Sequence, residues 1–239
     1  MRRAGATVAV LLGVLTAPIR AQSPSSGFVT HIRPYFWLSG VSGSVTSAPL
    51  TFPINSSFHD LLDNVQIGAF ASVTVEKPRW GLYGDFQYIS LKGEATGASG
   101  ATLELQNIIG EVDGFLRVPA GSGSLKFIGG LRVYSVDETL TPNTLSPIKS
   151  NTTVYDPILG AVGEWSIGKR WDFEMRGDLG GFGVGSEFTN QLSVVFQWQI
   201  NDKLRLPFGY RVLGYQIKDG EVEMDTRMTG LVVGLDIGF

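Results

Sequence analysis

The chain has 239 residues, of which 43% are hydrophobic and 17% are charged, and it contains 31 glycines and no cysteine. This length suits one domain or one barrel. The lack of cysteine excludes disulfides, thiolate catalysis and cysteine-ligated metal sites, and a formal net charge of −3 gives no sign of the basic face that a nucleic-acid partner needs.

The first residues have the pattern of a secretory leader. Arg2 and Arg3 precede an apolar run over residues 8–15 that is too short for a spanning helix, which needs roughly 20 apolar residues. We therefore expect residues 1–21 to be a signal peptide and residues 22–239 to be the mature protein. Removal of this leader takes away three arginines and no acidic residue, which changes the formal net charge from −3 to −6.

The rest of the chain alternates between apolar and polar residues with a period of two, which predicts β-strands rather than helices. Glycine, serine, threonine and asparagine gather between these segments, as is typical of turns. In chain order the predicted strands are residues 28–40, 64–76, 80–92, 101–118, 124–137, 153–167, 170–181, 188–201, 203–216 and 222–239.

The last predicted strand has the clearest alternation. Leu231, Val233 and Leu235 share one face, and the chain stops on the aromatic residue of that same face, Phe239. We interpret Phe239 as a C-terminal assembly signal through which the strand meets the barrel-assembly machinery.

The connections between the predicted strands alternate in length. Four are short, and most of the others are longer, which is the pattern of short periplasmic turns and longer outer loops in an outer-membrane barrel. The short connections are 77–79, 119–123, 168–170 and 201–203; the longer ones are 41–63, 93–100, 138–152, 182–187 and 217–221.

Four tryptophans lie within about three residues of a short turn and share the apolar face by parity. That position fits an interfacial aromatic girdle, because the indole ring is apolar while its N–H needs water or headgroups. The four are Trp80, Trp165, Trp171 and Trp198, whereas Trp37 falls on the polar face.

We therefore predict an all-β protein: a closed, antiparallel, up-and-down transmembrane β-barrel of about ten strands, with eight as the alternative. Periodicity alone does not separate a barrel with an apolar exterior from a soluble sandwich with an apolar core. The leader, the aromatic positions, Phe239 and the loop asymmetry favour the barrel, since lipid offers the backbone no hydrogen-bond partner.

The polar faces of these strands carry nine acidic and seven basic residues, which we predict to form a charge network in the lumen. Isolated charges there would be costly, so the mixed signs indicate pairing. The predicted network comprises Arg33, Glu76, Asp85, Glu111, Asp113, Arg117, Lys126, Arg132, Asp156, Glu164, Glu174, Arg176, Asp178, Arg205, Arg211 and Asp236.

This predicted network has two alternative interpretations. In the first, the charges fill the lumen and the protein is a structural or interaction barrel that works through its outer loops. In the second, the lumen is a narrow, porin-like channel for small polar solutes, because about ten strands enclose a space between that of filled barrels and that of wide porins.

Several short strings resemble those of a widespread, uncharacterised group of outer-membrane β-barrel proteins of Gram-negative bacteria, over nearly the whole mature chain. The resemblance implies a barrel in the outer membrane, in contact with its lipid, and supplies no catalytic residue. The strings are 34–38 (PYFWL), 57–64 (SFHDLLDN), 79–85 (RWGLYGD), 156–160 (DPILG), 177–186 (GDLGGFGVGS, the most specific) and 209–211 (GYR).

Two of these strings also have a local interpretation. The glycines of 177–186 favour a tight, bent loop, and a phosphate site is not expected because a strand follows instead of a helix. Residues 57–64 favour a short amphipathic helix in the first outer loop, with Phe58, Leu61 and Leu62 on one face. This apolar face is equally consistent with a lid or plug at the barrel mouth and with plain loop structure.

Catalysis has little support in the sequence. An outer-membrane protease of the omptin type places Asp and His around a water at the outer rim, and His59 near Asp60 and Asp63 is the one arrangement that invites the comparison. A solvated helix face with a charge pair explains it equally. We therefore expect no enzyme, cofactor or metal site, with an outer-membrane hydrolase as the remote alternative.

Overall fold

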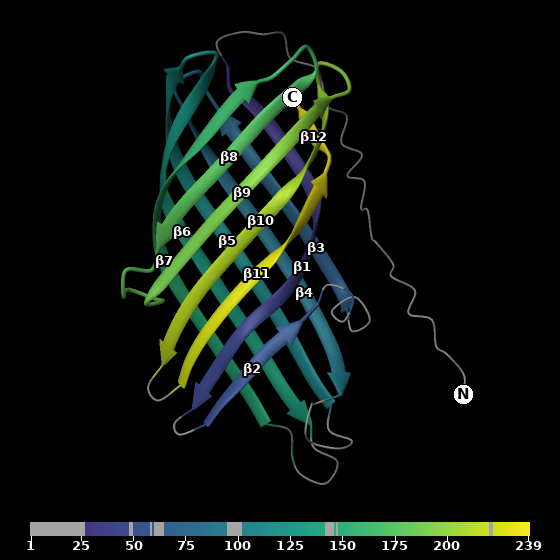
Figure 1. Ribbon diagram of the computed structural model, residues 1–239, viewed down its shortest axis with the longest axis vertical. Helices are drawn as coiled ribbons and strands as arrows, with labels where there is room; N and C mark the ends of the chain where they lie inside the picture. The colour runs from purple at the N-terminus through teal and green to yellow at the C-terminus, as the bar shows by residue number, and fades with distance from the viewer. Residues whose placement is uncertain are drawn as a thin grey trace, which may run out of the picture.

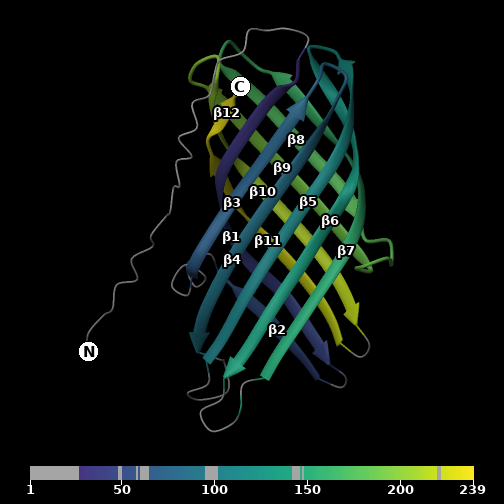
Figure 2. The same ribbon diagram turned by 180° about the vertical axis from the view of Figure 1, so that it is seen from behind.

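A computed structural model describes residues 27–47, 50–57, 59, 65–94, 102–141, 146, 148–219 and 222–239. The expected signal peptide, residues 1–21, lies outside these ranges. The described residues form a tall barrel of strongly tilted strands (Figures 1 and 2).

All the strands belong to one antiparallel sheet in which sequence neighbours pair from β3 through to β11. The strands are β1 (Val29–Ser47), β2 (Leu50–Ser56), β3 (Val65–Glu76), β4 (Trp80–Glu94), β5 (Thr102–Ala120), β6 (Gly123–Thr141), β7 (Ile148–Ser166), β8 (Trp171–Gly180), β9 (Phe188–Gln199), β10 (Leu204–Asp219), β11 (Val222–Gly234) and β12 (Asp236–Gly238).

The first and last strands close the barrel. β1 pairs with β11 and β12 on one side and with β3 on the other, so the sheet meets itself. β11 and β12 are one wall strand interrupted at Leu235, whose N–H donates to the Pro34 carbonyl at 3.0 Å. The wall therefore has ten strands, which confirms the predicted closed antiparallel barrel and excludes the eight-stranded alternative.

The sequence prediction was wrong about the outer ends of several strands. The expected loop 41–63 contains the outer part of β1 and the additional strand β2, which pair from Val41–Ser56 to Ser47–Leu50. The expected loop 138–152 is largely the ends of β6 and β7, paired in register to Leu140 and Ile148. Above the lipid the outward face of a strand no longer has to be apolar, so the alternation fades there although the strand continues.

The two ends of the barrel differ. The connections between β3 and β4, β5 and β6, β7 and β8, and β9 and β10 lie at the same end as the C-terminus, the upper end in Figure 1. Toward the other end β5, β6 and β7, each of 19 residues, reach far, whereas β8 has 10 residues and β9 has 12. At about 3.3 Å per residue and a tilt of about 40°, 19 residues rise roughly 48 Å, well beyond an apolar band of about 25 Å.

The apolar side chains face outward and the polar ones face inward. Outward positions such as Val112, Leu116 and Leu159 are exposed, whereas inward Asp113 and Arg132 are fully buried. This is the inverse of a soluble sandwich, and it rules that alternative out. Among the described residues, no helix has the length and apolar character needed to cross a membrane.

A charge placed on the outward face of β5 tests this orientation. We expect Val112→Arg, at a position that is 63% exposed in the middle of the apolar face, to lower the free energy of unfolding in lipid vesicles by about 2–4 kcal/mol. Gln106→Arg, toward the outer end of the same strand, should change it by about 0–1 kcal/mol. Guanidinium unfolding curves give both values, and equal effects at the two positions would contradict a lipid-facing exterior.

Candidate functional site: the lumen

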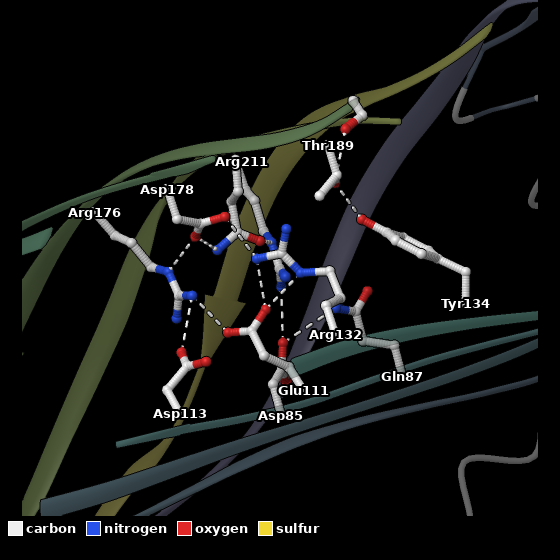
Figure 3. A network of polar contacts seen from close by, with 12 residues as sticks. Asp85, Gln87, Glu111, Asp113, Arg132, Tyr134, Arg176, Asp178, Thr189 and Arg211 are labelled. Carbon is white, nitrogen blue, oxygen red and sulfur yellow. Dashed lines mark hydrogen bonds and ion pairs between the residues drawn. The ribbon is translucent and has the colours of Figure 1, made fainter. Parts of the chain in front are cut away.

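A layer of charged and neutral polar side chains crosses the lumen (Figure 3). Its members come from seven wall strands and are all buried. We call it the central network: Tyr35 (β1), Asp85 and Gln87 (β4), Glu111 and Asp113 (β5), Arg132 (β6), Arg176 and Asp178 (β8), Gln191 (β9) and Arg211 (β10).

Two arginines link β5, β6 and β8 within this network. Arg132 Nε lies 2.6 Å from Glu111 Oε2, and its Nη2 lies 2.8 Å from Asp178 Oδ1. Arg176 reaches Asp113 at 3.0 Å, Glu111 at 2.6 Å and Asp178 at 2.8 Å. The two guanidinium groups thus share carboxylates, so each link depends on the others.

The third arginine, Arg211, bonds to side chains on the strands near the point where the barrel closes. Arg211 Nη1 lies 3.1 Å from both Asp85 Oδ2 and the Tyr35 hydroxyl, and its Nε donates to Gln191 Oε1 at 2.8 Å. Tyr35 in turn donates to Asp85 at 2.8 Å, and Gln87 donates to the same carboxylate at 3.1 Å. A chain of bonds therefore runs from β1 and β4 to β9 and β10.

A second set of ion pairs lies nearer the short-turn end, between β3, β5, β6 and β7. Arg117 lies 2.7 Å from Glu76 and 3.4 Å from Glu164, while Lys126 lies 3.3 Å and 2.5 Å from the same two carboxylates. Two bases thus alternate with two acids around a closed ring of contacts.

On the wall formed by β1 and β12, Asp236 contacts two residues of β1. It accepts from Arg33 at 2.9 Å and contacts His31 Nδ1 at 2.7 Å, and Arg33 also lies 3.8 Å from Glu174. Within the described part of the chain, Arg205 is the one base of the predicted network that has no ion-pair partner.

These two sets surround a cavity of about 500 Å³ on the short-turn side of the central network. Arg33, Lys126 and Arg205 line its walls, and Asp113 and Arg211 line its inner end. The cavity is thus a polar vestibule that ends at the central network.

The outer half of the lumen holds an apolar cluster that the sequence prediction missed. Leu213, Tyr215 and Ile217 have the same parity as inward-facing Arg211, which was the available signal. Tyr134 and Tyr215 pack with ring centroids 4.7 Å apart, and the Tyr134 hydroxyl lies 2.6 Å from Thr189 Oγ1. The cluster comprises Tyr35, Trp37, Ile109, Tyr134, Leu213, Tyr215, Ile217 and Met228.

One residue of the predicted lumen network has another role. Asp156 is fully buried on β7, but its carboxylate accepts from Ser186 N at 2.7 Å and from Ser186 Oγ at 2.5 Å. Asp156 thus anchors the loop between β8 and β9 and has no basic partner among the described residues.

Three of the four tryptophans of the predicted girdle are exposed, and the fourth, Trp165, is among the residues that line the vestibule. Trp80, Trp171 and Trp198 are exposed on the outer surface near the short turns, and Trp165 is half-buried beside Phe173. Phe239 is exposed on the same surface, and its N–H donates to the Thr30 carbonyl at 2.9 Å.

The structure offers no further support for chemistry at the outer rim. His59 is exposed, and Asp60 and Asp63 lie outside the described residues. Within those residues, no group of three or more His, Asp and Glu side chains is placed to hold a metal ion.

The sequence matches no family model, and it matches no curated protein. The fold is similar to that of the outer membrane protease OmpT from Escherichia coli, with a TM-score of 0.61 and 9% identity over 92% of this chain and 99% of that one. Ail of Yersinia pestis (TM-score 0.42, 11% identity, 90% and 100% of the chains) and Neisserial surface protein A (0.37, 12%, 90% and 98%) are also similar. The likeness to OmpT shows a shared outer-membrane β-barrel fold and carries no statement about activity.

Removal of one arginine tests the central network. We expect Arg132→Met to lower the free energy of unfolding in vesicles by about 3–5 kcal/mol, because it leaves buried carboxylates short of a partner. The exposed pair of Lys92 and Glu104 provides the control, and Lys92→Met should change stability by about 1 kcal/mol or less. A small effect of Arg132→Met would show that the network contributes little to the fold.

Proposed function

We propose that this protein is a sealed barrel of the Gram-negative outer membrane that acts through its outer surface and conducts no solutes. In this proposal, residues 1–21 direct export, and the last strand with Phe239 is the signal for the barrel-assembly machinery. Lipid is the partner of the apolar exterior. The residues of the lumen serve to hold the walls together.

The observation that carries this proposal is the central network. Its carboxylates and guanidinium groups bond to one another across the lumen, as Arg176 on β8 does with Asp113 on β5 and Arg211 on β10 does with Asp85 on β4. A conducting pore needs charged groups that leave a water-filled path between them. The apolar cluster lies in series with the network, so a solute that passed one layer would still meet the other.

The alternative of a narrow channel draws support only from the polar vestibule. Its lining includes paired acids and bases, as expected for a polar solute path. For conduction, Arg176 and Arg211 would have to leave their carboxylates, and the packed Tyr134 and Tyr215 rings would have to separate. The structure therefore favours the sealed state, and the protease activity of OmpT is not proposed for this chain.

If the lumen is sealed, the outer surface is the part of the barrel that can interact with other molecules. On β6 and β7 the outward apolar residues end at about Val133 and Tyr155, and the strands then continue with exposed polar residues such as Asp137, Asn151 and Thr153. Because a barrel wall that only crosses the lipid needs no such extension, we propose that it presents a surface to other molecules.

Conductance in planar bilayers tests the seal. We expect the purified protein to insert and to show no steady single-channel conductance, since the two layers close the lumen. Insertion is verified in parallel vesicles by the heat-dependent shift of a folded barrel on a gel. Steady, reproducible conductance steps would overturn the sealed barrel and support the channel.

Trimming the longest hairpin tests whether its outer end is needed for the fold. Asp137 and Asn151 are register partners, so residues 138–150 can be replaced by an Asn-Gly turn that joins them. We expect the free energy of unfolding to change by no more than about 1 kcal/mol, because an exposed hairpin end is only marginally stable by itself. A larger loss would assign the extension to the stability of the barrel and not to its surface.

A further inference from the structure

The loop between β8 and β9, residues 181–187, differs from the other outer connections in its height. β8 and β9 are shorter than their neighbours β7 and β10, which have 19 and 16 residues. Twelve residues at about 3.3 Å each, tilted by about 40°, rise roughly 30 Å, which is close to the height of the apolar band. Loop 181–187 therefore sits at the outer boundary of the lipid, while the neighbouring strands continue past it.

The backbone of this loop is held in an unusual conformation. Three successive residues have positive φ: Gly181 at 82°, Phe182 at 51° and Gly183 at 73°. Phe182 is the one non-glycine residue with positive φ among the described residues, and an L-residue with a bulky side chain is strained in that region. A strained residue persists only where the surrounding structure enforces it.

The surrounding bonds enforce this conformation. Gly183 N–H donates to the Ser186 carbonyl at 3.1 Å, and Val184 N–H donates to the Gly181 carbonyl at 2.9 Å. Ser186 is fully buried and bonds twice to the carboxylate of Asp156, which is also fully buried. The loop is thus clamped to the inside of β7, and its tip has one defined position.

That position exposes two apolar side chains. Phe182 is 54% exposed and Val184 is 72% exposed. The loop projects sideways from the wall at the ends of β8 and β9, to the left in Figure 1 and to the right in Figure 2. The strained backbone holds the apolar side chain of Phe182 in an exposed position. We therefore expect this side chain to contact an environment other than water.

The neighbouring surface identifies this environment. Leu179, just before the loop, and Leu159, its register partner on β7, are both exposed on the outward face. Phe188, just after the loop, is exposed as well. The apolar tip therefore continues the lipid-facing surface of the barrel and does not form a separate patch above it.

We propose that loop 181–187 is a membrane anchor whose Phe182 and Val184 insert into the acyl-chain region of the outer leaflet. The anchor would fix the height of the barrel on its β7–β9 side, where the wall is lowest. This proposal rests on the proposed membrane location. The occupant is lipid because the tip lies at the height of the apolar band and is continuous with it.

The absence of cysteine from the chain allows a direct test with single spin labels. Val184→Cys, Leu192→Cys and Ser146→Cys are each labelled in protein refolded into vesicles of dimyristoyl phosphatidylcholine. Leu192 lies on the apolar face of β9, and Ser146 lies in the outer connection between β6 and β7. Collision rates with oxygen and with a water-soluble nickel chelate then report the depth of each label.

We expect the ratio of oxygen to nickel collisions at position 184 to lie below that at the deeper position 192 and to exceed that at position 146 several-fold. A ratio at 184 like that at 146 would place the tip in water and overturn the anchor. Protection of 184 from both reagents would show cover by protein, such as a second copy of the chain, and would also overturn it. If position 192 itself faced water, the membrane location would be wrong and the anchor would fail with it.

Discussion

The lipid interior offers no hydrogen-bond partner, and the rest of this structure follows from that constraint. Backbone groups within the bilayer must pair inside the protein, so the sheet has to close, and β1 does so by pairing with β11 and β12 on one side and β3 on the other. Closure divides each strand into a face toward lipid and a face toward an enclosed interior. Charged side chains have only the second face available.

Enclosure then decides how the charges are arranged. In a narrow lumen an isolated charge would be costly, and the central network avoids this because each arginine shares its carboxylates with other polar groups. Arg132 and Arg176, for example, both bond to Glu111 and Asp178. The same pairing that makes the interior acceptable also links strands that are not neighbours in the sheet, and the apolar cluster lies on its outer side.

The outer end of the barrel shows how height on the wall determines what a segment does. β6 and β7 rise beyond the apolar band and carry polar residues on both faces, whereas β8 and β9 stop at its boundary. The loop that joins these two shorter strands displays Phe182 and Val184, and buried Asp156 holds it in place. The sequence prediction placed Asp156 in the charge network of the lumen. In the structure this residue instead positions an outer loop.

Sequence alone determined the strands, because a period of two is a property of each strand by itself: Leu231, Val233 and Leu235 share a face whatever the strand pairs with. The leader, the aromatic positions, Phe239 and the loop asymmetry then favoured a barrel over a sandwich. The strand number, the order along the chain and the inward placement of the charges follow from the same local signal. Only the tertiary structure decided which charges meet, since Arg211 and Asp85 are 126 positions apart and come together through closure. It also decided the outer ends, where the chain continues as β2 and as the extensions of β6 and β7 without a clear alternation of apolar and polar residues. The parity of β10 places Leu213 inward, but the side chains that pack against it come from other strands, as does the Asp156 carboxylate that holds the loop at Phe182.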